Sequence, residues 1–261
     1  MLFVEGKFDA RLLRRIYPKS KMEIKPIESD SNNKQSLIEL ITSDELKGYY
    51  TTGLVDADSD FFLTKYLERK ILPYHKKLID TSPASDMNIL VSCTDGVEDY
   101  IRTIISDDKK VMKILQFTKC MGILRALKRN YEIKNNRKVV LKLNDTSDYF
   151  TKNRSFLPTE QEIIGKLKSL SEHHSSTKFF KFVEEKERYQ KVKKRIVRES
   201  IDTMHFINGH DLSRAISVYS HRLTPREVEA LQIKNASREK LSQYGPFSRI
   251  NQWITDYPFD P

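Results

Sequence analysis

Short apolar segments alternate with segments of helical periodicity over the first part of the chain, and this alternation limits the folds open to it. The segments predicted to form strands are 2–5, 22–27, 49–55 and 87–93. The segments predicted to form helices are 7–17, about 34–47, 61–72 and 97–105. Such an order favours a parallel sheet covered by helices. Because Pro26 lacks an amide hydrogen, we expect the second strand at an edge of that sheet.

The remainder of the chain has a mainly helical pattern. Helices are predicted at 109–131, over most of 159–200, and at about 209–222, 225–233 and 237–243. One further strand is predicted at 139–143. We therefore expect an α/β region over residues 1–108, followed by a mainly helical region over residues 109–261 for substrate binding, dimerisation or partner docking.

The composition narrows the class of protein. Lysine and arginine number 46 against 36 acidic residues, which gives a net charge of +10 and a pI near 9.4. This excess attracts polyanions such as nucleic acids, although a generally basic surface is a second interpretation. No apolar run approaches the roughly 18 residues of a membrane helix, and the first residues lack the pattern of a secretory signal. Only Cys93 and Cys120 occur, so we expect a reducing cytoplasm rather than a disulfide framework.

Acidic residues stand at the ends of two predicted strands. Glu5 ends the first strand, and three candidate metal ligands, Asp56, Asp58 and Asp60, follow the strand at 49–55. If these strands are parallel neighbours, Glu5, Asp56 and Asp58 meet at one edge of the sheet, where their charges repel. A divalent cation would relieve that repulsion, and an all-oxygen donor set favours Mg²⁺, or Mn²⁺, over zinc. In a second interpretation, Asp58 or Asp60 caps the helix that follows.

Two motifs resemble those of toprim domains. Residues 4–9, VEGKFD, look like the toprim V-E-G-K-x-D motif, and residues 55–60, VDADSD, look like its D-x-D motif. The resemblance covers roughly residues 1–110 and implies a Rossmann-like sheet. It also implies that Glu5 is a general acid or base or a metal ligand, and that Asp56 and Asp58 hold magnesium. Lys7 belongs to the first motif, and we expect it to neutralise a phosphate beside the metal; a solvated lysine is the alternative.

Two further segments narrow the resemblance. Residues 94–100 and 206–212 are similar to segments of OLD-like toprim effectors of anti-phage defence, nearest the nuclease component of PARIS-type systems. This resemblance implies a toxic endonuclease that cleaves RNA, with transfer RNA as one substrate, and that is a homodimer held inactive by an ATPase partner. Asp95 and Glu98 form a capping-box pattern, but Glu98 is also a candidate metal ligand. His210 is expected to cap or pack rather than to catalyse.

Basic residues gather in two predicted helices of the second region. The candidates for contact with nucleic acid are Arg125, Lys128 and Arg129 in one helix and Lys191, Lys194 and Arg195 in the other. The alternative is a solvated helix face with ion pairs one turn apart. Two other functions stay open: a ribonuclease that matures ribosomal RNA, and a toprim adaptor without catalysis. The P-loop motif is missing, so an ATP-driven step would need a partner.

Overall fold

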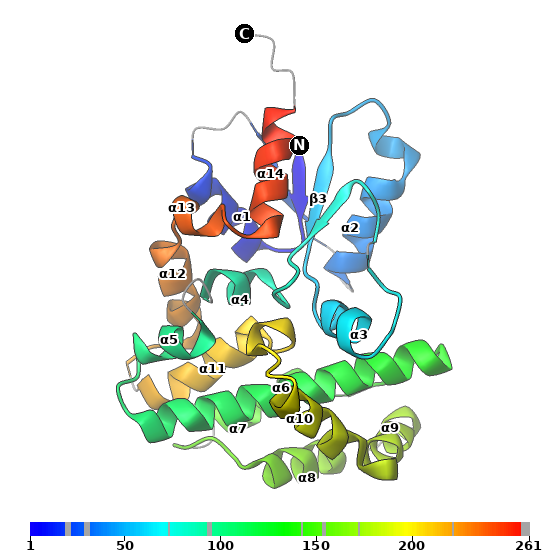
Figure 1. Cartoon of the computed structure of the whole chain (residues 1–261), viewed down its shortest axis with the longest axis vertical. Helices are drawn as coiled ribbons and strands as arrows, with labels where there is room; N and C mark the ends of the chain where they lie inside the picture. Colours follow the sequence, from blue (N-terminus) through cyan, green and yellow to red (C-terminus); the bar gives the residue numbers. More distant parts are fainter. Residues whose placement is uncertain are drawn as a thin grey trace.

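The computed structural model describes residues 1–18, 22–28, 32–72, 74–92, 96–141, 143–152, 155–171, 173–220 and 222–256. Within them the first region contains β1 (Leu2–Val4), α1 (Lys7–Ile16), β2 (Ile24–Pro26), α2 (Asn33–Thr42), the 3₁₀ turn η1 (Asp44–Leu46), β3 (Thr52–Val55), α3 (Asp60–Tyr66), β4 (Leu78–Asp80), α4 (Met87–Ser92) and α5 (Val97–Arg102). The second region contains α6 (Asp108–Asn135), α7 (Leu143–Lys152), α8 (Glu160–Leu170), α9 (His174–Glu184), η2 (Glu185–Glu187), α10 (Arg188–Arg198), η3 (Thr203–His205), α11 (Gly209–Ser220), α12 (Pro225–Asn235), α13 (Arg238–Leu241) and α14 (Gly245–Thr255). The predicted α/β class is confirmed (Figure 1).

The sheet is parallel, with its four described strands in the order β2-β1-β3-β4. β1 therefore lies between β2 and β3, with Val4 opposite Leu54. The predicted edge position of the strand that contains Pro26 is confirmed. Because the strands are parallel, the residues that follow Val4 and Val55 emerge at the same edge of the sheet.

The two faces of the sheet bury different residues of the same strands. Leu2, Val4 and Leu54 pack into the main core, which also contains the apolar face of α1. Phe3 and Val55 pack instead into a smaller core beneath α2. Strand alternation thus places a helical layer on each face. Gly53 permits close approach to α2, since a Cβ there would lie 2.6 Å from Leu37 Cδ2.

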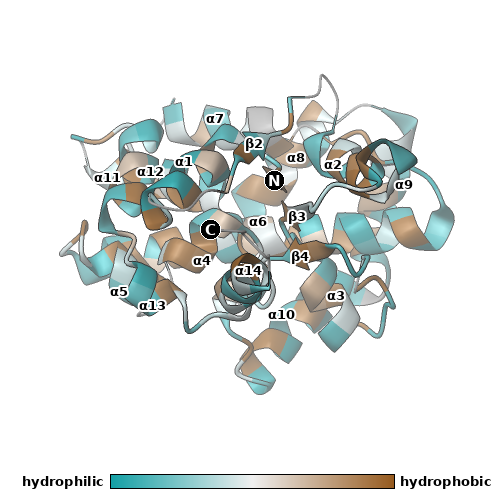
Figure 2. Ribbon diagram, turned by 90° about the horizontal axis from the view of Figure 1, so that it is seen from above, coloured by the Kyte–Doolittle hydropathy of each residue, from teal (hydrophilic) through white to brown (hydrophobic). Residues whose placement is uncertain are grey.

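The predicted strand at 87–93 is wrong where the structure describes it, because residues 87–92 form α4. All six residues of α4 are buried, and Figure 2 shows the helix mostly brown. Periodicity cannot distinguish a short apolar strand from a helix buried on every side. The fourth strand of the sheet is β4, which the sequence analysis did not predict.

The helical region differs from prediction in three places. No strand occurs at 139–141, and the helix α7 begins at Leu143. α7 and α14 were not predicted, whereas the predicted helices that correspond to α6, α8–α13 are present with shifted ends. α6 runs across the molecule below the sheet, with α8, α9 and α10 beyond it (Figure 1).

The end of the described chain packs back on the sheet. Arg249 Nη2 donates to the carbonyl oxygen of Asp80 at 2.7 Å, and the rings of Tyr50 and Trp253 stack with centroids 5.1 Å apart. Tyr17 donates to Asn251 Oδ1 at 2.9 Å. The second region therefore contributes contacts to the first, and the division at residue 108 stays a prediction.

Candidate functional site

Glu5 and Asp56 meet at the carboxyl edge of the sheet. β1 and β3 are adjacent and parallel, as the candidate site requires. The Glu5 carboxylate accepts a hydrogen bond from the backbone N–H of Asp56, with 2.7 Å between Oε1 and N. Both residues are half-buried. The strand order thus brings together two acids that lie 51 positions apart in the sequence.

Two more acids occupy the same edge. Asp9 lies on the first turn of α1 and accepts a hydrogen bond from Gly6 N at 3.1 Å. Asp86 lies in the loop between β4 and α4 and accepts from Ile89 N at 2.8 Å. Asp56 Oδ1 accepts from Met87 N at 3.0 Å. Asp56 and Asp86 therefore cap the amino end of α4, where the helix dipole favours negative charge.

We call Glu5, Asp9, Asp56 and Asp86 the acidic edge. Burial raises the pKa of Glu5 to about 8, that of Asp9 to about 7 and that of Asp86 to about 6. Burial, followed by repulsion from Asp9 and Glu5, raises the pKa of Asp56 well above its usual value. Among the described residues, none of these four carboxylates forms an ion pair. The acidic edge is thus a cluster of carboxyl groups for which ionisation is unfavourable without an added cation.

Lys34 lies beside the acidic edge, and no sequence motif predicts it there. Its Nζ donates to the carbonyl oxygen of Asp56 at 2.5 Å and lies 2.9 Å from Asp58 Oδ2. Burial alone would lower the pKa of Lys34, but Asp58 and other acidic neighbours raise it well above its usual value. The Asp58 carboxylate stays about half exposed, at 53%. Asp58 also has a φ of +48°, so its backbone is in the left-handed region.

Asp60 has a different environment from Asp56 and Asp58. Its Oδ1 accepts from Arg129 Nε at 3.0 Å, and its Oδ2 accepts from the Tyr74 hydroxyl at 2.5 Å. Lys34 lies 3.4 Å away. Burial opposes ionisation, but Lys34, Tyr74 and Arg129 together hold the pKa of Asp60 below its usual value. Asp60 therefore joins α3 to α6, and the structure does not bring it into the acidic edge as a free ligand.

Glu98 and Lys7 lie at the surface. Glu98 pairs with Arg102 on the next turn of α5, with 2.7 Å between Oε1 and Nη2. No contact among the described residues joins Glu98 to the acidic edge, and Asp95 lies outside those residues. Lys7 Nζ lies 3.0 Å from Glu28 Oε1, with both side chains exposed. The chain thus turns Lys7 away from Glu5 and into a groove described below.

The segment around His210 fastens the helical region to the acidic edge. Gly209 N donates to Asp86 Oδ2 at 2.8 Å. A Cβ on Gly209 would lie 2.3 Å from the Cβ of Asn88, so only glycine allows this approach. His210 Nδ1 lies 2.7 Å from Glu229 Oε1, a contact with α12 rather than with the acidic edge. Asp211 pairs with Arg125, with 3.1 Å between Oδ2 and Nε.

The donor chemistry of the acidic edge fits a magnesium ion. Carboxylate oxygens are the ligands that Mg²⁺ prefers, and a cation would relieve the repulsion that raises these pKa values. The residues are not drawn together into a finished site, however. In the described ranges, no three acidic, histidine or cysteine side chains are grouped closely enough to hold a metal ion. The ammonium group of Lys34, beside the acidic edge, pairs with Asp58 and Asp60.

Most of the basic residues predicted to contact nucleic acid are engaged in ion pairs. Arg125 pairs with Asp211 and Arg129 with Asp60, both toward the interior. Lys128 pairs with Glu132 and Arg195 with Glu199, one turn along their helices. Lys191 and Lys194 are exposed on α10 and have no ion pair within the described part of the chain. Of the six candidates, these two are the ones left available to an external polyanion.

Comparisons of the chain with protein-family models, with curated proteins and with solved structures found no match. The resemblance to toprim domains therefore stays a prediction that rests on the motifs at residues 4–9 and 55–60. Across the described ranges, no helix is both long and apolar enough to cross a membrane. Cys120 is buried and free, whereas Cys93 lies outside the described residues.

Proposed function

We propose that this chain is a magnesium-dependent endonuclease of the toprim type whose catalytic centre is the acidic edge together with Asp58. One observation carries the proposal: four carboxylates, two buried and two half-buried, lie together at one edge of the parallel sheet, form no ion pair among the described residues, and have raised pKa values. Structural carboxylates are normally paired when buried. Perturbed acids that share one edge are typical of a site that binds a cation or moves protons.

Three acids of the proposed centre have roles that follow from their contacts. Asp56 and Asp58 are the residues that would hold the ion, and Lys34 would have to release Asp58 to make room for it. Bound magnesium supplies charge to stabilise the phosphate oxygens during cleavage. Glu5 accepts from Asp56 N through Oε1, so Oε2 is the oxygen free to carry a proton. With a pKa raised to about 8, Glu5 is suited to donate or accept that proton near neutral pH.

The test is a cleavage assay on transfer RNA, other RNA, plasmid DNA and linear DNA, with magnesium or with a chelator. We expect magnesium-dependent cleavage that falls by roughly 100-fold or more in Glu5→Gln and in Asp56→Asn. The matched control is Asp44→Asn, which removes an exposed carboxylate on η1 and should leave the rate unchanged. Cleavage that persists in both acidic-edge variants, or no cleavage of any substrate by the unmodified protein, would contradict the proposal.

The biological setting remains part of the proposal. Preference for RNA, the role of toxic effector in anti-phage defence, inhibition by an ATPase partner, the homodimer and a cytoplasmic location rest on the resemblance and on the composition. A size-exclusion measurement of the purified chain tests the homodimer directly. The cleavage assay above tests the preference for RNA, because it presents RNA and DNA under the same conditions.

A further inference from the structure

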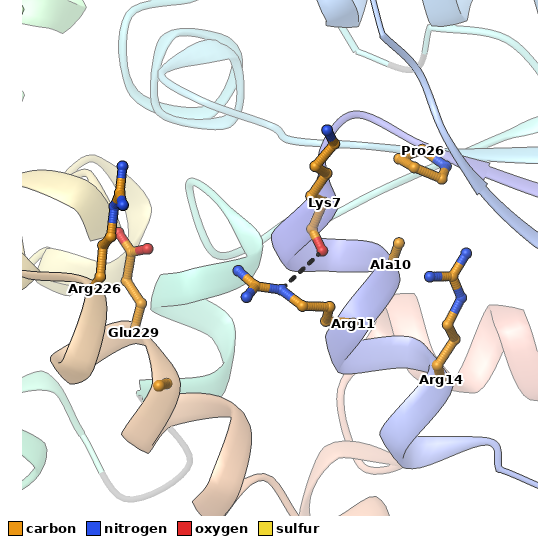
Figure 3. A pocket seen from close by; sticks show the side chains of 8 residues that line it. Lys7, Ala10, Arg11, Arg14, Pro26, Arg226 and Glu229 are labelled. Atoms are coloured by element: carbon orange, nitrogen blue, oxygen red, sulfur yellow. Dashed lines mark hydrogen bonds between the residues drawn. The ribbon is translucent and has the colours of Figure 1, made fainter.

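A groove lies between α1 and α12, beside the acidic edge. Its volume is about 630 Å³. The residues that line it are Lys7, Ala10, Arg11, Arg14, Pro26, Arg226, Glu229 and Ala230. Figure 3 shows Arg11 extending from α1 toward α12, where Arg226 and Glu229 stand on the facing wall. Helices from opposite ends of the chain therefore build one concave surface.

The groove has an excess of positive charge. Arg11 Nε donates to the Lys7 carbonyl oxygen at 3.3 Å, and Arg14 Nη2 donates to the Ile24 carbonyl oxygen at 2.7 Å. Backbone carbonyls position these guanidinium groups without neutralising them. Among the described residues, no carboxylate pairs with Arg11, Arg14 or Arg226. These arginines therefore keep their charge for a ligand.

The one carboxylate of the groove is already engaged. Glu229 accepts from His210 at 2.7 Å, and this hydrogen bond raises the pKa of the His210 imidazole. The neighbouring Gly209 contacts Asp86 of the acidic edge. On the opposite wall, Lys7 follows Glu5 by two positions. Each wall of the groove is thus connected to the acidic edge, one along the chain from Lys7 to Glu5 and the other through His210 and Gly209 to Asp86.

We infer that the α1–α12 groove binds the sugar–phosphate backbone of a nucleic acid strand and leads it to the acidic edge. Guanidinium groups bind phosphate oxygens in a two-point geometry, and here they stand on two facing helices. Cations spread along a groove match a row of phosphates rather than one small anion. The inference rests on the proposed nuclease function, because the strand is led to the proposed catalytic centre. Binding of the strand can be measured without cleavage.

The experiment measures binding of a fluorescently labelled single-stranded RNA by anisotropy, in a chelator that prevents cleavage. The test variant is Arg11→Gln with Arg226→Gln. The matched control is Lys109→Gln with Lys113→Gln, which removes the same charge from exposed positions on α6. We expect the groove variant to bind on the order of tenfold more weakly, with a salt dependence reduced by about one phosphate contact per residue. The control variant should bind nearly as the unmodified protein does.

Two additions make the result decisive. Inorganic phosphate and a mononucleotide, added as competitors, distinguish a small-anion site from a backbone site, because only a small-anion site is emptied by them at low concentration. Circular dichroism checks that the groove variant is folded, as expected for exposed side chains. Unchanged RNA binding by the groove variant, or an equal loss in the control, overturns the inference.

The inference and the proposed function fail in different ways. If the groove variant binds RNA weakly but the unmodified protein cleaves nothing in magnesium, the groove stands and the nuclease proposal fails. If the groove variant binds and cleaves as the unmodified protein does, while Asp56→Asn is inactive, the nuclease proposal stands and the groove is overturned.

Discussion

Buried carboxylates occur in two settings in this molecule, at the acidic edge and along α6. Asp211 is fully buried against α6, and Arg125 contacts it through two nitrogens, each 3.1 Å from a carboxylate oxygen. The Ser147 hydroxyl donates to the same carboxylate at 3.1 Å. Asp56 and Asp86 are of the same residue type, but within the described part of the chain they accept hydrogen bonds only from backbone N–H groups. The same residue type is therefore neutralised by a cation in one place and left without one in the other.

The presence or absence of a paired cation distinguishes a structural carboxylate from a candidate functional one. A buried acid with a bidentate arginine partner contributes to holding two helices together, because losing either partner leaves the other charge unpaired. Acids without cations instead reduce stability and are retained where a ligand supplies the missing charge. This comparison predicts opposite responses to the same substitution at the two places.

The largest expected effect is the difference in the free energy of unfolding between Asp211→Asn and Asp56→Asn. The first change leaves the buried Arg125 guanidinium without its counterion, so the free energy of unfolding should fall by about 3–5 kcal/mol. The second keeps an oxygen for Met87 N and removes a repelled charge, so stability in chelator should be unchanged or higher. Urea unfolding at one pH measures both, and similar losses in the two variants would break the comparison.

A smaller effect is expected from pH. Glu5, Asp9 and Asp86 have folded-state pKa values above their usual ones, so between about pH 4 and pH 8 the folded protein binds more protons than the unfolded chain. Their contribution is fully present below the usual pKa values and is lost as the pH rises through the raised ones. In chelator, the free energy of unfolding should therefore fall as the pH rises from about 5 to about 8.

Magnesium sharpens the pH test. Raising the pH toward about 8 increases the ionisation of Glu5, Asp9 and Asp86, and magnesium at ten times its Kd should then add about 1.4 kcal/mol of stability. The double variant Glu5→Gln with Asp56→Asn should show a weaker pH dependence and no response to magnesium. Thermal unfolding in chelator and in magnesium gives both readings. A double variant that retains the full magnesium response would place the cation elsewhere.

The sequence predicted the centre of the fold because β1 and β3 carry strand patterns with acids at their ends. The parallel order then placed Glu5 beside Asp56. The sequence-based prediction was wrong at α4, because an apolar run that is buried on all sides lacks the periodicity of a helix with one exposed face. β4 is only three residues long, and its detection depended on contacts with β3 rather than on its own pattern.

The rest of the site depends on tertiary contacts. Asp86 lies in the loop after β4, so missing that strand also concealed this acid. Lys34 lies on the first turn of α2, and nothing in its local sequence indicates contact with Asp58. Asp60 shares the spacing of Asp56 and Asp58, but Lys34, Tyr74 and Arg129, all at least 14 positions away, determine its environment. A side chain's partner across the fold cannot be obtained from spacing.

The smallest expected effect is that of Glu98→Gln, a substitution that tests whether the comparison extends to exposed acids. Glu98 pairs with Arg102 on the surface of α5, and both side chains are at least 40% exposed. Solvent screens such pairs, so the unfolding temperature should change by no more than about 1 °C. Because no described contact joins Glu98 to the acidic edge, magnesium-dependent cleavage and the magnesium response in thermal unfolding should both be unchanged. Loss of either in Glu98→Gln would show that α5 supplies a ligand after all, and the acidic edge would then extend beyond the ends of the strands.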